Sequence, residues 1–215
     1  MKKGLTEMVF ILDRSGSMHG LENDTVGGFN SMIEKQKAEE GEALVFTVLF
    51  NSESFVLHDR VPIASVPPMT EKQYTASGNT ALMDAVADAI AHIGNVHKYA
   101  RDEDVPERTV FVITTDGMEN ASRRHTHRDV RNLIERQKAK YGWEFLFLGA
   151  NIDAEGVAEE IGIERKNAVR YHNDPIGMQC NYAAVGEAMS SVRKHGAVSE
   201  DWAKEIKRDY KSRKK

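Results

Sequence analysis

The strongest fold signal in the chain is the segment Met8-Val-Phe-Ile-Leu-Asp13-Arg-Ser15-Gly-Ser17-Met18. Its first five residues are apolar, and a short apolar run bounded by turn residues is typical of a buried β-strand. A polar loop follows, and open α/β sheets bind their ligands at the carboxyl ends of their strands. Asp13, Ser15 and Ser17 carry hard oxygen donors, so this loop is a candidate site for Mg²⁺, Mn²⁺ or Ca²⁺.

Strand-like and helix-like patterns alternate along the rest of the chain. Apolar runs predict further strands, and amphipathic stretches with capping residues predict the helices between them, with strands at 44–50, 54–58, 109–114, 143–148 and 168–171. This alternation predicts a doubly wound, Rossmann-like α/β fold, in which helices cover both faces of a mostly parallel sheet of about six strands. Only residues 51–53 separate two of the runs, which predicts a hairpin and one antiparallel edge strand.

The length of 215 residues suits one large domain, or one domain with a small appendage. We expect residues 1–197 to form this single domain. Residues 198–215 end in Lys211-Ser-Arg-Lys-Lys215 and are predicted to be a charged C-terminal tail, either helical or frayed.

Composition excludes several classes of protein. The formal net charge of −4 leaves no global basic surface for nucleic acid. Cys180 is the only cysteine, so no internal disulfide can form and a reducing compartment is expected. Residues 8–12 are too short for the apolar part of a signal peptide, and no segment approaches the roughly 18 apolar residues of a membrane span. We therefore expect a soluble cytoplasmic protein that binds neither nucleic acid nor membrane.

Two further segments carry polar side chains at positions comparable to the first loop. Thr80 stands just before a predicted helix within residues 76–82, and Asp116 ends the strand-like run before Gly117. The carboxyl ends of parallel strands meet at one edge of a sheet, so these side chains are expected to converge with the first loop. The predicted metal ligands are Asp13, Ser15, Ser17, Thr80 and Asp116. Two carboxylates and three hydroxyls leave a hard cation one position for water or for a ligand carboxylate.

Together, the three segments resemble the metal-ion-dependent adhesion site of the von Willebrand factor type A family. That site reads Asp-x-Ser-x-Ser, then a distant Thr, then a distant Asp in a Thr-Asp-Gly context, and all five positions match here. The likeness covers about residues 5–195. Residues 115–122 and 143–153 are similar to stand-alone bacterial and phage members of the family.

The resemblance implies a function as well as a fold. It implies a Mg²⁺ ion, with Mn²⁺ or Ca²⁺ as alternatives, whose coordination is completed by an Asp or Glu of a partner protein. Ser15 and Ser17 would bind the cation directly, and Asp13 directly or through water. It also implies protein binding and not catalysis. Prokaryotic relatives often serve as adaptors or assembly factors, some beside AAA-type ATPases, so an AAA-type ATPase system is a candidate partner.

Five residues flank the predicted metal loops and are candidates for the rim of a partner surface: His19, Asn79, Glu119, Asn151 and Asp153. Each also has a simpler explanation. Solvated side chains are common beside any loop, and Asp153 could cap the short helix that follows it.

Two other functions compete with metal-dependent protein binding. A Mg²⁺-dependent phosphohydrolase of the haloacid-dehalogenase type would use Asp13 as its nucleophile. Such enzymes need a second acid two residues later, where this chain has Ser15, and no Gly-x-x-x-x-Gly-Lys-Ser/Thr loop is found. A nucleic-acid-binding role through the basic C-terminus is disfavoured by the acidic charge balance.

Overall fold

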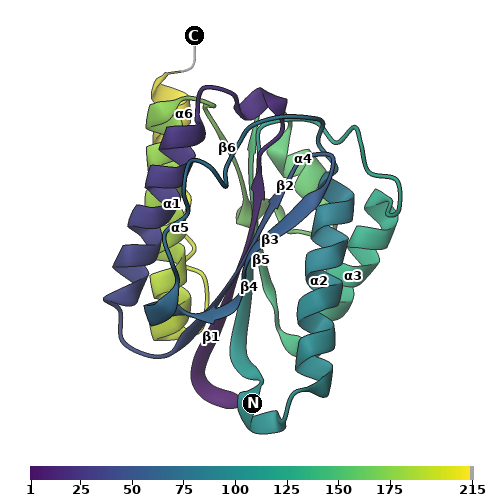
Figure 1. Cartoon of the computed structure of the whole chain (residues 1–215), viewed down its shortest axis with the longest axis vertical. Helices are drawn as coiled ribbons and strands as arrows, with labels where there is room; N and C mark the ends of the chain where they lie inside the picture. The colour runs from purple at the N-terminus through teal and green to yellow at the C-terminus, as the bar shows by residue number, and fades with distance from the viewer. Residues whose placement is uncertain (214–215) are drawn as a thin grey trace.

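Six strands form one sheet at the centre of the computed structural model, which describes residues 1–213 (Figure 1): β1 (Lys2–Asp13), β2 (Ala43–Phe50), β3 (Ser54–Pro62), β4 (Pro106–Thr115), β5 (Glu144–Ala150) and β6 (Ala168–Tyr171). Their order across the sheet is β3-β2-β1-β4-β5-β6. All neighbours run parallel except β3, which pairs antiparallel with β2 at one edge. The predicted mostly parallel sheet with one antiparallel edge strand is confirmed.

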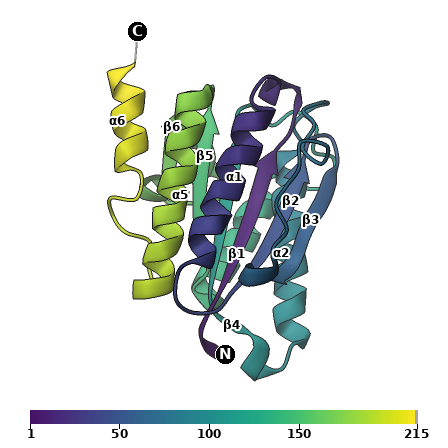
Figure 2. The same ribbon diagram turned by 60° about the vertical axis from the view of Figure 1, so that its left-hand side comes forward.

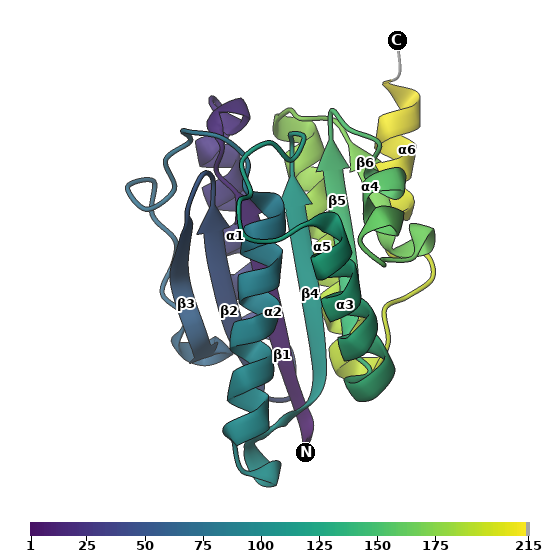
Figure 3. The ribbon, with the colours of Figure 1, turned by 90° about the vertical axis from the view of Figure 1, so that its right-hand side faces the viewer.

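Helices cover both faces of this sheet, as predicted. One face carries α1 (Glu22–Lys37), α5 (Pro175–His195) and α6 (Lys204–Ser212), as Figure 2 shows. The other face carries α2 (Leu82–Tyr99), α3 (His127–Tyr141) and α4 (Ala154–Glu160), which Figure 3 brings to the front. Single turns of 3₁₀ helix lie in the connections: η1 (Gly16–Met18), η2 (Ile63–Ser65), η3 (Asp102–Asp104) and η4 (Arg165–Asn167).

The central strand β1 contributes side chains to two hydrophobic cores. Met8, Phe10 and Leu12 belong to the core on the α1 and α5 side, whereas Val9 and Ile11 belong to the core on the α2 and α3 side. None of these five residues is more than 2% exposed. Successive side chains of a strand point to opposite faces, so an uninterrupted apolar run requires cover on both faces. The doubly wound arrangement supplies that cover.

Local capping signals fix several helix ends. Thr126 and Asp129 form a reciprocal capping box at the start of α3. The Asp174 side chain accepts a hydrogen bond from the Gly177 amide, and Pro175 follows as the first residue of α5. Asp153 occupies the N-cap position of α4, but its side chain makes no capping hydrogen bond there. It forms an ion pair with Arg170 instead, so the expected capping role is wrong.

The C-terminal segment packs on the domain. Residues 204–212 form α6, and Trp202, Ala203 and Ile206 are buried within the same core as β1. The Trp202 indole Nε1 also donates a hydrogen bond to the Lys166 carbonyl oxygen (3.1 Å). The segment is thus helical over Lys204–Ser212, and the burial of these apolar side chains docks it on the domain. Lys214 and Lys215, which belong to the predicted basic tail, lie outside the described residues.

None of the helices within residues 1–213 is long and apolar enough to span a membrane.

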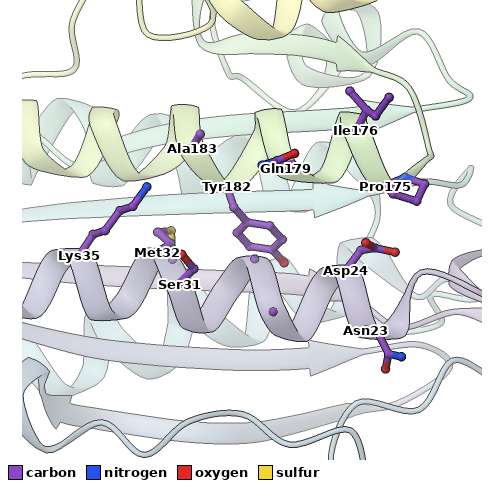
Figure 4. Close-up of a pocket in the computed structure, with 12 residues that line it drawn as sticks. Asn23, Asp24, Ser31, Met32, Lys35, Pro175, Ile176, Gln179, Tyr182 and Ala183 are labelled. Carbon is purple, nitrogen blue, oxygen red and sulfur yellow. The ribbon is translucent and has the colours of Figure 1, made fainter.

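Helices α1 and α5 pack closely against each other on one face of the sheet. Figure 4 shows Tyr182 reaching from α5 toward α1, and Tyr182 is one of the residues that line a hollow of about 460 Å³. A Cβ atom added at Gly28 would lie only 2.3 Å from Cδ2 of the Tyr182 ring. A Cβ atom added at the neighbouring Gly27 would have no atom within 4 Å. Gly28 therefore permits the helix contact, whereas Gly27 faces open space.

This difference predicts opposite effects for two otherwise identical substitutions. Gly28→Ala should lower the free energy of unfolding by about 1–3 kcal/mol, because the Tyr182 ring must move in a packed interface. Gly27→Ala should raise it by about 0.5–1 kcal/mol, because alanine favours helix over glycine and meets no obstacle. Urea denaturation followed by circular dichroism measures both values. Equal stabilities for the two variants would contradict the close approach.

Candidate metal centre

The loop after β1 is held by hydrogen bonds to the Asp13 carboxylate. Its Oδ1 accepts from the Ser15 amide (2.7 Å), and its Oδ2 accepts from the Thr115 hydroxyl of β4 (2.6 Å). The hydroxyl of Tyr74 donates to the Asp13 carbonyl oxygen. Asp13 therefore joins the exit of β1 to the exit of β4, and the chain continues from it into η1.

The other predicted ligands lie next to this loop. Ser15 Oγ and Ser17 Oγ are 3.0 Å apart, and Ser17 Oγ donates to Asp116 Oδ1 at 2.6 Å. A Cβ atom added at Gly117 would lie 3.4 Å from Ser17 Oγ and 3.5 Å from Thr80 Oγ1, so Thr80 borders the same space. The structure thus brings together all five side chains, which come from three separate segments. Their binding of a metal stays a prediction.

Asn120 fixes the position of Thr80. Its side-chain Oδ1 accepts a hydrogen bond from the Thr80 backbone amide (2.9 Å), and its backbone amide donates to the Thr80 carbonyl oxygen (3.1 Å). The loop after β4 therefore holds the loop before α2 through both the amide and the carbonyl group of Thr80. Thr80 does not itself cap the helix, which begins at Leu82.

Burial gives the site its electrostatic character. Asp13 is 2% exposed and Asp116 is 1% exposed, whereas Ser17 reaches the surface. Burial raises the pKa of both carboxyl groups above the ordinary value, and their hydrogen bonds only partly oppose it. Every hydrogen bond that the two carboxylates accept within the described residues comes from a neutral donor. A buried charge without a counter-charge is costly, and a cation at this point would remove that cost.

The donor set fits a hard cation. Within residues 1–213, no group of three or more His, Cys, Asp or Glu side chains is arranged to hold a metal, and the candidate donors here are two carboxylates and three hydroxyls. The observed oxygen separations are 3.0 Å for Ser15–Ser17 and 2.6 Å for Ser17–Asp116. Neighbouring oxygens around an octahedral Mg²⁺ are about 3.0 Å apart, because each bond is about 2.1 Å long. The site therefore suits Mg²⁺ or a similar oxygen-binding ion.

The five predicted rim residues differ in what they contact. His19 and Asn79 are exposed beside the site. His19 Nδ1 lies 3.2 Å from Oε1 of Glu22, the first residue of α1. Asn151 adopts a left-handed backbone conformation (φ 56°), and its Nδ2 donates to the Asp116 carbonyl oxygen (3.2 Å). Asp153 is exposed and paired with Arg170.

Glu119 points into the protein. Its two carboxylate oxygens accept hydrogen bonds from the amides of Met83, Ala121 and Ser122 and from the Ser122 hydroxyl. These bonds tie the loop after β4 to the first turn of α2. A structural role for Glu119 explains all of its contacts.

Sequence reasoning missed four residues that support the site: Tyr74, Thr115, Asn120 and Asn173. Thr115 adjoins Asp116, so its place at the end of the strand was a usable signal. Tyr74 lies 61 positions from Asp13, and Asn173 lies 57 positions from Asp116. No local pattern marks either of these two pairs.

No protein-family model matches this chain, and no curated protein sequence matches it. Its fold is similar to the von Willebrand factor domain of the type V pili tip protein Mfa5 from Porphyromonas gingivalis. The TM-score is 0.61 at 10% identity, over 91% of this chain and 98% of that one.

Two other solved structures are similar. A von Willebrand factor type A protein from Catenulispora acidiphila gives a TM-score of 0.54 at 14% identity, over 86% of this chain and 42% of that one. Proximal thread matrix protein 1 from the mussel byssus, with a zinc-occupied MIDAS motif, gives a TM-score of 0.56 at 11% identity, over 85% of this chain and 47% of that one. This chain thus spans less than half the length of these two proteins. The likenesses show that it has a von Willebrand factor type A fold.

Proposed function

We propose that this chain is a divalent-cation-dependent protein-binding module. Asp13, Ser15, Ser17, Thr80 and Asp116 hold the cation, and an Asp or Glu of the partner completes its coordination. The observation that carries the proposal is the convergence of these five oxygen donors at the carboxyl edge of the sheet, with the acids buried and Ser17 at the surface. A bound cation supplies an electrophilic position that an external carboxylate can occupy.

Exposed apolar side chains at the same edge support a protein partner. Phe55 is 47% exposed opposite the end of β2, Met118 is 73% exposed just after Asp116, and Ile176 is 54% exposed at the start of α5. Aromatic side chains and methionine are enriched in protein interfaces, and exposed apolar surface often marks a binding site. We therefore propose that the partner presents its acid among apolar residues.

A polar hollow beside Thr80 adds room for residues that flank the partner's acid. It has a volume of about 750 Å³, and Asn79, Asp84, Asn120 and Arg123 are among the residues that line it. Its mixture of amide, acidic and basic groups suits the backbone and polar side chains of a bound segment.

Several features favour Mg²⁺ and a binding role over catalysis. Hydroxyl and carboxylate oxygens prefer hard cations, and the mussel protein shows that a similar fold can carry an occupied metal site. The chain does not favour the alternative phosphohydrolase, because Ser15 stands where such an enzyme needs a second acid, two residues after Asp13. An adaptor or assembly role, beside an AAA-type ATPase as in some proteins it resembles, is the biological setting that we propose.

A peptide-display library tests this function. Peptides with one Asp or Glu among apolar residues are selected on the protein in Mg²⁺ and then measured in EDTA. We expect the affinity to fall at least about tenfold in EDTA, which removes the cation, and for Ser17→Ala, which removes one of its proposed oxygen ligands. Ser31→Ala, an exposed serine on α1, serves as the matched control and should bind normally. Selected peptides that bind equally well in EDTA would refute metal-dependent binding.

A further inference from the structure

The loop between β6 and α5 reaches the metal centre from the edge of the sheet. Asn173 in this loop donates a hydrogen bond from Nδ2 to Oδ2 of Asp116 at 2.7 Å. The other oxygen, Oδ1, accepts from Ser17 at 2.6 Å. The two oxygens of Asp116 therefore have separate partners, one in the metal loop and one in the loop before α5.

The two halves of the Asn173 amide are not equally satisfied. Its Oδ1 is buried and has no hydrogen-bond partner among the described residues. Rotating the amide by half a turn would place Oδ1 against Asp116 Oδ2, and two acceptors repel each other. A buried unpaired acceptor costs about 1–3 kcal/mol. Asn173 is therefore a poor choice for stability alone, and its one strong contact is the bond to Asp116.

Contacts on both sides of Asn173 hold its backbone in place. The His172 ring stacks on Tyr210 of α6 with centroids 4.5 Å apart, and His172 Nε2 lies 3.2 Å from the Tyr210 carbonyl oxygen. Asp174 accepts from the Gly177 amide and forms an ion pair with Arg213 (2.5 Å). The docked C-terminal helix thus fixes the loop that carries the amide.

We propose that Asn173 is a positioning residue of the metal centre, which holds Oδ2 of Asp116 so that Oδ1 faces Ser17 and the cation. The inference rests on the proposed function, because it requires a cation at this site. Without the Asn173 amide, the Asp116 carboxylate can rotate about its Cβ–Cγ bond. Fixing its orientation when the cation binds then costs free energy, so the metal affinity is lower. Hydrogen bonds that orient metal ligands typically contribute about 10–100-fold to metal affinity.

A Mn²⁺ titration followed by electron paramagnetic resonance tests the proposal on the full chain. We expect Asn173→Ala to bind Mn²⁺ about 10–100-fold more weakly than the wild type. Asn173→Ser is the second variant and should weaken binding in the same direction. Asn167→Ala, in η4 before β6, is the matched control and should leave the affinity unchanged. Thermal unfolding in EDTA should change little for Asn173→Ala, because the lost hydrogen bond to Asp116 is offset by removal of the unpaired Asn173 oxygen.

A second readout follows the amide itself. The side-chain amide resonances of Asn173 should shift when Mg²⁺ is added to the wild type, and the shift should vanish in Asp116→Ala. Wild-type binding with an unchanged affinity in both Asn173 variants would overturn this inference alone. A wild type that binds no Mn²⁺ would overturn the proposed metal site and this inference together.

Discussion

Replacing Asp13 by alanine should abolish Mn²⁺ binding at the carboxyl edge of the sheet. Asp13 supplies one of the two carboxylates of the site, and it also holds the Ser15 amide and the Thr115 hydroxyl. The loss should exceed the roughly 10–100-fold that follows removal of a group that only orients a ligand. The measurement is the free-ion Mn²⁺ signal in an electron paramagnetic resonance titration, with one site per chain expected for the wild type.

Two controls separate metal binding from other effects of this substitution. Glu53→Ala removes one negative charge from an exposed position in the turn between β2 and β3, at the same edge of the sheet. Because salt screens charges at a distance, its Mn²⁺ affinity should stay within about twofold of the wild type. Unchanged one-site binding by Asp13→Ala would instead place the cation elsewhere on the protein.

Asp13→Asn tests whether the acid is kept for function and not for stability. The asparagine can still accept from the Ser15 amide, and it removes a charge that is buried without a counter-charge. In EDTA we expect its midpoint of thermal unfolding to equal or exceed that of the wild type, while Mn²⁺ binding is strongly weakened. A less stable metal-free variant would mean that the charged form of Asp13 supports the fold.

Glu7→Ala should destabilise the protein more than Gly28→Ala does. The side chain of Glu7 is fully buried in β1, and its carboxylate pairs with Arg60 Nε and with His97 Nε2, each at 2.5 Å. The side chains of Arg60 and His97 are only 19% and 9% exposed, so both lose their partner in a site with little water. Removing one member of a buried ion pair typically costs about 3–5 kcal/mol.

Urea denaturation measures this effect as a lower midpoint with an unchanged slope. Glu42→Ala is the matched control, because Glu42 pairs with Lys2 at 2.6 Å but both side chains are well exposed. Exposed pairs contribute little, so this control should change the free energy of unfolding by less than about 1 kcal/mol. Similar midpoints for the two variants would mean that the buried cluster around Glu7 adds nothing to stability.

Local signals were sufficient to predict the architecture. The apolar run at residues 8–12 predicted a strand covered on both faces, and the short connection at 51–53 predicted the antiparallel edge strand. The capping pattern at Thr126 and the Asp174-Pro175 pair placed the starts of α3 and α5. Such signals depend on neighbours within a few positions along the chain, so they can be recognised without a structure.

The five predicted ligands were recognisable for a related reason. Each stands at a strand exit or just before a helix, and parallel strands carry such positions to one edge of the sheet. The sequence alone therefore determined the fold class and the residues that gather at the candidate site.

Only the tertiary structure decided how those residues are supported. Asn173 holds Asp116 because β6 ends near the metal loop, and Glu119 turns inward because α2 begins beside it. The C-terminal segment docks instead of fraying because its apolar face meets β6 and α5. These contacts join residues that are far apart along the chain, and hydrogen bonds and apolar burial depend on separations in space that the strand order and the helix packing set.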